Sequence, residues 1–144
     1  MKLTIRTNLA MRTLMFCAAN PGRTVRKQEV ATACNASENH LSQVIHKLAK
    51  AGFITTVRGR SGGLLLRRDP AGLPVGEVVR WFESSVALTE CLSADRGNCP
   101  LVASCLLTCA FSDALKAFYD SLDRVTLADL VHNNTGLKAL LKVA

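Results

Sequence analysis

The amino-acid sequence predicts a mainly α-helical fold with one small β-hairpin, and three patterns along the chain indicate it. Residues 38–50 carry apolar side chains at the spacing of one buried helix face, namely Leu41, Val44, Ile45, Leu48 and Ala49. Two short runs of apolar and β-branched residues, 53–57 and 64–67, flank a glycine-rich stretch and are typical of a hairpin. A longer apolar helical pattern covers residues 104–123.

Composition indicates a globular chain with an uneven distribution of charge. The 144 residues are 49% hydrophobic and carry a net charge of +7, so they can bury a core. Residues 1–70 hold twelve Lys/Arg and three Asp/Glu, whereas residues 71–144 hold six and eight. A basic first half favours a polyanionic partner, most often nucleic acid, although the same charge can form a simply solvated surface.

Neither a secretory signal nor a membrane span is visible in the sequence. Arg12 interrupts the apolar run of residues 9–19, and no apolar run is long enough to cross a bilayer. We therefore expect a cytoplasmic protein. In that reducing compartment, a group of cysteines is more often a metal or redox site than a set of disulfides.

The first elements predict a helix-turn-helix. A first helix ends near residues 20–22, where Pro21 and Gly22 turn the chain. A short second helix covers residues 27–33, and Ser37 is a natural N-cap for the third. The exposed face of that third helix presents side chains that can reach base edges or phosphates in a major groove, namely His40, Gln43 and Lys47.

The hairpin is expected to form a wing beside the third helix. Its tip, residues 58–63, contains three glycines together with Arg58 and Arg60. The glycines let the tip approach a DNA backbone, and the two cations suit phosphate or a minor groove. A helix-turn-helix followed by such a hairpin is a winged helix-turn-helix, which predicts binding to double-stranded DNA. A nucleotide-phosphate loop is excluded because no Walker lysine follows the glycines.

Residues 73–144 are expected to form a second part, with residues 1–72 as the DNA-binding domain. A helix over residues 75–84 carries Trp81, which we expect in the core. The apolar helix over residues 104–123 lies outside the winged domain, so we expect it to pair with a second copy in a homodimer. A homodimer implies a palindromic operator, because one recognition helix reads only a half-site. Thr126 begins a capping box that opens a last short helix.

Four of the six cysteines fall within residues 90–109. Cys91, Cys99 and Cys105 belong to a loop that contains Gly, Asn and Asp, and a loop can bend until three thiols converge. Thiolate is the ligand that iron–sulphur clusters and zinc prefer, so we expect these three to bind metal. The remaining cysteines stand in apolar helical patterns and are expected to be ordinary core residues, namely Cys17, Cys34 and Cys109.

Over nearly its whole length the chain resembles the winged-helix transcriptional repressors that carry an iron–sulphur cluster. The resemblance rests on residues 37–41, on residues 57–63 of the wing, on the cysteine triplet and on residues 127–131. It is closest to the nitric-oxide-sensing NsrR group, with features of the iron-responsive RirA group. The resemblance implies three further DNA-binding residues, Ser37, Asn39 and Ser61.

The same resemblance implies a cofactor and a fourth ligand. The cofactor is a 4Fe-4S cluster held by the three cysteines, with 2Fe-2S as the alternative. Some members take their fourth ligand from the partner subunit, as an aspartate at the position of Asn8. Asn8 departs from that pattern, because a neutral amide is a poorer ligand for iron than a carboxylate.

These observations predict a DNA-binding repressor whose operator affinity is controlled by a cluster that senses nitric oxide. Three thiolates with at most one weak further ligand leave one iron open to attack. The alternatives are an iron-responsive repressor and a regulator that uses the cysteines as a zinc or thiol switch. An electron carrier is disfavoured because it has no need of a basic winged helix. No nucleophile–base pair, paired carboxylates or cofactor loop indicates an enzyme.

Overall fold

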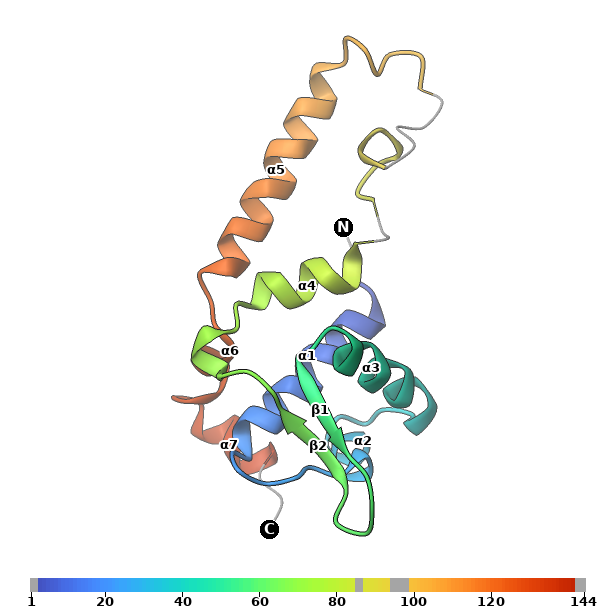
Figure 1. The fold of residues 1–144 in the computed structure, drawn as a ribbon. Coiled ribbons are helices and arrows are strands. Elements are labelled where there is room, and N and C mark those ends of the chain that lie inside the picture. Colours follow the sequence, from blue (N-terminus) through green and yellow to red (C-terminus); the bar gives the residue numbers. More distant parts are fainter. Residues whose placement is uncertain (1–2, 85–86, 94–98, 142–144) are drawn as a thin grey trace.

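The computed structural model describes residues 3–84, 87–93 and 99–141, and its helices surround a central helix, α1 (Figure 1). Helix α1 (Ile5–Ala19) contacts α3, α4, α6, α7 and the second strand of the hairpin. A single long helix, α5 (Leu106–Asp123), projects away from this helical body. The predicted class, mainly helical with a two-stranded hairpin, is confirmed.

The helix-turn-helix consists of α2 (Lys27–Ala33) and α3 (Glu38–Lys50). The short connection between them includes Asn35, which has a positive φ of 46°. Ser37 is the N-cap of α3, as predicted, and its hydroxyl oxygen accepts a hydrogen bond of 3.2 Å from the backbone N–H of His40. Helix α3 buries Leu41, Val44, Ile45 and Leu48 and is followed by Gly52 at a φ of 77°.

The wing is an antiparallel pair of strands, β1 (Ile54–Val57) and β2 (Gly63–Leu66). Ile54 lies opposite Leu66, and Val57 lies opposite Gly63. The base of the wing is tied to the chain before α2, because Val25 exchanges two backbone hydrogen bonds with Leu64, of 2.9 and 2.7 Å. This bridge sets the wing beside the helix-turn-helix.

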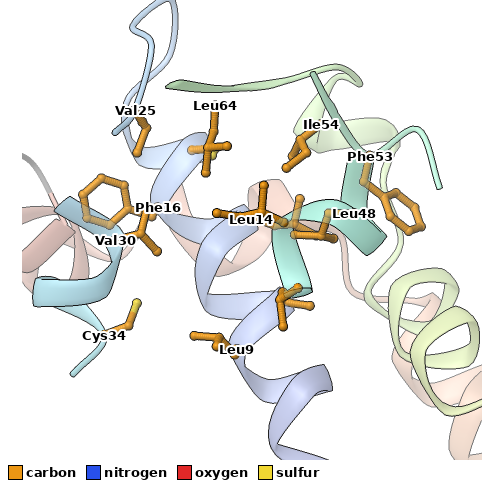
Figure 2. Close-up of a cluster of buried hydrophobic side chains, with 14 of the residues drawn as sticks. Leu9, Leu14, Phe16, Val25, Val30, Cys34, Leu48, Phe53, Ile54 and Leu64 are labelled. Carbon is orange, nitrogen blue, oxygen red and sulfur yellow. The ribbon is translucent and has the colours of Figure 1, made fainter. Parts of the chain in front are cut away.

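The core gathers around α1 (Figure 2). Leu14 and Phe16 of α1 are fully buried, and Leu48 of α3, Val30 of α2 and Ile54 of β1 pack around them. Cys17 and Cys34 belong to the same core, which confirms that they are ordinary core residues. Burial raises the pKa of Cys17 to about 12 and also raises that of Cys34, where the charge of Arg12 opposes it.

The chain after residue 69 adds the short elements η1 (Pro70–Gly72), α4 (Val75–Glu83), η2 (Glu90–Leu92), α6 (Leu127–Val131) and α7 (Thr135–Leu141). Of these, α4, α6 and α7 contribute buried side chains to the same core. The Thr126–Asp129 capping box opens α6 as predicted. We expected α6 to be the last helix, and this was wrong, because α7 follows it. Asn134 begins α7 locally by accepting from the N–H of Leu137 at 2.9 Å. The division at residue 72 stays a prediction.

Two further expectations of burial were wrong. Trp81 is 38% exposed, because it packs edge-on against Phe53 at the rim of the core, with ring centroids 6.3 Å apart. Cys109 is exposed on α5, because none of the residues of this helix is buried in the single chain. Among the helices of residues 3–84, 87–93 and 99–141, none is long and apolar enough to cross a membrane.

Candidate functional site

The exposed face of α3 is the first candidate surface. Asn39, His40 and Gln43 are exposed on it, as expected of residues that contact DNA. Ser37 is exposed too, but its hydroxyl is already engaged as the helix cap. Lys47 is only half-exposed, and its ammonium lies 6.0 Å from the centroid of the Phe82 ring.

A lysine that the sequence did not single out joins α2 to α3. The ammonium of Lys27, at the start of α2, lies 3.1 Å from a carboxylate oxygen of Glu38 and donates to Ser42 at 3.3 Å. Both partners lie in the first turns of α3. The contact joins the two helices on their exposed side, where an ion pair contributes at most about 1 kcal/mol, and the buried side chains of both helices set the angle between them.

The tip of the wing presents the second group of predicted contacts. Arg58, Arg60 and Ser61 are all exposed there. The tip closes with a hydrogen bond of 2.9 Å from the N–H of Gly62 to the carbonyl of Gly59, which has a φ of 106°. A Cβ at Gly62 would collide with the carbonyl of Val57, so glycine is needed at this position for the tip to close.

Arg6 is the clearest residue of this surface that sequence reasoning missed. It lies in the first turn of α1, and its guanidinium donates to the side-chain oxygen of Gln43 on α3 at 3.5 Å. The two residues are 37 positions apart, so the sequence held no local signal for the contact. Only the packing of α1 on α3 brings them together.

The cysteines form the second candidate site, at the tip of α5. The cysteine segment, residues 87–93 and 99–105, leads into this helix, and Cys105 is its N-cap. The pKa of Cys105 is lowered by the backbone N–H of Thr108 and, next, by the Thr108 hydroxyl. The pKa of Cys91 is lowered by the Thr89 hydroxyl, 3.1 Å from its sulfur, and then by Thr108, with Cys105 opposing.

Thr108 therefore stands between two of the three predicted ligands. Its hydroxyl oxygen is buried, and within the described residues it has no hydrogen-bond partner of ordinary geometry. It faces a cavity of about 520 Å³ lined also by Cys91, Val102, Cys109 and Asp113. This donor set suits an iron–sulphur group, because both thiols are biased toward the thiolate form that binds iron and the Thr108 hydroxyl can donate a hydrogen bond to one ligand sulfur.

Cys99 is not brought to the other two cysteines. It is half-buried and begins a turn in which its carbonyl accepts from the N–H of Val102 at 3.3 Å. Within the described ranges, no three His, Cys, Asp or Glu side chains are close enough to hold one metal ion. Residues 94–98, which join Cys91 to Cys99, lie outside those ranges. The ligand triplet stays a prediction, as does Asn8, which is exposed on α1.

Comparison with known proteins decides the family. A family model described as "Rrf2: Iron-dependent Transcriptional regulator" matches residues 3–133. The chain belongs to the Rrf2 family. Its relatives include the HTH-type transcriptional regulator NsrR of Geobacillus kaustophilus, 41% identical over 143 residues that cover 99% of this chain and 97% of NsrR. The protein aau3 of Rhizobium meliloti is 42% identical over 141 residues, which cover 98% of this chain and 92% of aau3.

Solved structures of Rrf2-type regulators have the same fold. The Bacillus subtilis global cysteine regulator CymR matches with a TM-score of 0.69 and 25% identity, over 92% of this chain and 97% of CymR. IscR of T. potens matches with a TM-score of 0.71 and 25% identity, over 95% of this chain and 90% of IscR. The Rrf2 assignment confirms that the chain is a DNA-binding, winged-helix transcriptional regulator of the NsrR type and not an enzyme.

Proposed function

We propose that this chain is a cytoplasmic, homodimeric repressor whose affinity for a palindromic operator is set by an iron–sulphur cluster that nitric oxide dismantles. The observation that carries the proposal is that Thr108, which lines one cavity with Cys91, lowers the pKa of both Cys91 and Cys105. The iron-dependent family to which the chain belongs supports it further. The DNA contacts would come from the exposed residues of α3 and the wing tip described above.

Cys91, Cys99 and Cys105 would hold the cluster, with 4Fe-4S preferred. When bound, it supplies an iron with an incomplete set of thiolates, which is open to nitric oxide. The Thr108 hydroxyl would donate a hydrogen bond to a ligand sulfur. The N-terminus of α5 would stabilise the negative charge on Cys105. Cys109 lines the cavity that Cys91 and Thr108 also line, but it is an exposed thiol on α5 and is not one of the three proposed ligands.

Helix α5 supports the homodimer. It is an 18-residue helix without a buried side chain in the single chain, and Leu106 and Leu107 are 83% and 58% exposed. Its exposed residues include a series at alternating spacings of three and four, which would face a second copy: Leu107, Ala110, Ala114 and Ala117. Small side chains at these positions let two helices approach closely. Burying this apolar surface provides the free energy for the pairing.

Antiparallel pairing would link the cysteine site to the partner. An 18-residue helix is about 27 Å long, so the tip of each α5 would lie beside the helical body of the other protomer. Asn8, exposed on α1, would thereby become available to the partner's cysteine segment. A loss of order in that segment would alter the α5 pair and hence the spacing of the two recognition helices. A coupling of about 3 kcal/mol, on the order of a hundredfold in affinity, is enough for a switch.

The cofactor is tested by anaerobic purification followed by iron and sulphide assay. Cys91→Ser, Cys99→Ser and Cys105→Ser are each expected to remove the visible absorbance and to weaken operator binding together. Cys109→Ser is the matched control, because that thiol lies one helical turn after Cys105 and lines the same cavity as Cys91. Equal loss of absorbance in the control would mean that the ligand set is wrong. A colourless zinc-loaded protein would favour the zinc or thiol switch instead.

An iron-responsive repressor is the second candidate, and a specific observation favours it. The neutral Asn8 is a weak ligand for iron, which suits a cluster that is lost when iron is scarce. The two signals are separated by binding the cluster-loaded dimer to its operator without oxygen and adding either stoichiometric nitric oxide or a mild chelator. Release by the chelator alone, under conditions in which nitric oxide does nothing, would establish the iron-responsive function.

A further inference from the structure

A buried carboxylate fixes the first turn of α1. Glu83, at the end of α4, is only 6% exposed. Its carboxylate oxygen accepts from the backbone N–H of Thr4 at 2.8 Å and from the Thr4 hydroxyl at 2.9 Å. The Thr7 hydroxyl donates to the same oxygen. Because one charged acceptor takes three donors from one turn, the backbone there has little freedom.

That fixed turn places Arg6 beside the recognition helix. Arg6 lies between the two threonines that bind Glu83, and a groove of about 310 Å³ separates α1 from α3 at this point. Its walls are formed by Thr4, Ile5, Arg6 and Leu9 on one side and by His40, Gln43 and Val44 on the other. Across it, the guanidinium donates to the Gln43 side-chain oxygen at 3.5 Å, the long end of hydrogen bonding.

The contact sets the orientation of the Gln43 amide. Arginine only donates hydrogen bonds, so the Gln43 atom that faces Arg6 must be the oxygen Oε1 rather than the nitrogen Nε2. A carbonyl oxygen has two acceptor sites, so Oε1 can accept from Arg6 and from a base at the same time. With Oε1 held in this way, Nε2 is the atom left to donate to a neighbouring base.

We propose that Arg6 is a specificity-determining residue of the DNA interface, which acts by holding Gln43 in the orientation that recognises adenine. A glutamine reads adenine by accepting from N6 and donating to N7 in the major groove. A glutamine held in advance loses less side-chain entropy on binding. The proposal rests on the proposed function of α3 as the helix that reads the operator, and it adds a residue from a different helix to that reading.

The test uses a duplex that the wild-type protein selects from a randomised pool. Affinity is then measured for all four base pairs at each half-site position, with wild type, Arg6→Met, Gln43→Ala and the double variant. Met keeps the unbranched stem and the helix propensity of Arg6 but removes its donors. Arg124→Met is the matched control, because it removes one exposed charge after α5. Thermal unfolding checks that each variant folds.

Arg6→Met is expected to lower the preference for adenine on the order of tenfold, at the one position where Gln43→Ala also lowers it. The double variant should discriminate no worse than Gln43→Ala, because the two residues then act as one unit. A uniform loss over all sequences, equal to that of Arg124→Met, would overturn the proposal. So would a Gln43→Ala protein that keeps full discrimination. Failure of wild type to select any duplex would instead overturn the proposed function.

Discussion

Arg80 on α4 and Asp123 at the end of α5 form an ion pair, with a nitrogen–oxygen distance of 2.5 Å. The same guanidinium lies over the ring of Tyr119, 4.7 Å from its centroid. Gly76, one turn before Arg80, leaves no room for a side chain, because a Cβ there would collide with the Asp123 carboxylate. Together these contacts fasten the C-terminal end of α5 to α4.

We predict that Gly76→Ala destabilises the protein by about 1–3 kcal/mol, because the added methyl forces the base of α5 away from α4. Urea unfolding at constant protein concentration measures this. Gly72→Ala is the matched control, since a Cβ at Gly72 meets nothing within 4 Å, and it should change stability by less than about 0.5 kcal/mol. Equal effects of the two substitutions would show that α5 is not fastened at Gly76.

Glu83 makes the stability of the fold depend on pH. Burial alone raises the pKa of Glu83, but hydrogen bonds from Thr7 and Thr4 outweigh it and hold the pKa below its ordinary value of 4.5. The unfolded chain therefore binds more protons near that value, and stability rises with pH there. The contribution of Glu83 is complete above pH 4.5 and is lost as the pH falls through the lower, folded pKa.

We predict that Glu83→Gln costs about 1–3 kcal/mol near neutral pH, because an amide accepts hydrogen bonds less strongly than a carboxylate. The difference in unfolding free energy between wild type and variant should be constant from about pH 6 to 8 and shrink below the ordinary pKa of the carboxyl. Chemical denaturation at several pH values measures it. A difference that grows toward acid would contradict the assignment of Glu83 as a charged acceptor.

The wing is predicted to contribute charge rather than sequence reading. Replacing Arg58 and Arg60 together by Ala should weaken binding to all duplexes alike and lower the salt slope by about one unit for each lost phosphate contact. The measurement is affinity as a function of salt concentration. If affinity and slope both stay at the wild-type values, the wing does not touch DNA.

Thr108 is predicted to have opposite effects with and without the cofactor. Thr108→Val removes a buried hydroxyl that has no ordinary partner among the described residues, so the cofactor-free protein should be as stable as wild type or slightly more stable. The loaded protein should lose iron to a chelator on the order of ten times faster, as with other residues that support metal ligands. Thr108→Ser keeps the hydroxyl and should behave like wild type. Equal rates for Val and Ser would remove Thr108 from the site.

Local signals in the sequence predicted the fold well. Ser37 and Thr126 cap their helices through atoms three residues away, so short motifs were enough to find them. Trp81 and Cys109 were misjudged because burial depends on packing between distant elements, and an apolar helical pattern alone does not show whether anything packs on α5. Arg6 was missed for the same reason, since its contact crosses 37 positions.

Because α5 is fastened at Asp123 while Cys105 caps its other end, the helix has the geometry of a lever with its pivot at the base. An arm of about 27 Å turns a displacement of about 2 Å at the tip into a tilt of only about 4° at the pivot. A displacement of the cysteine segment would therefore reach α4 as a small rotation of α5 about its base. The torque of that rotation grows with the length of the helix. Stiffness at the pivot, set by Gly76 and Arg80, would decide how much of that rotation the DNA-binding helices receive.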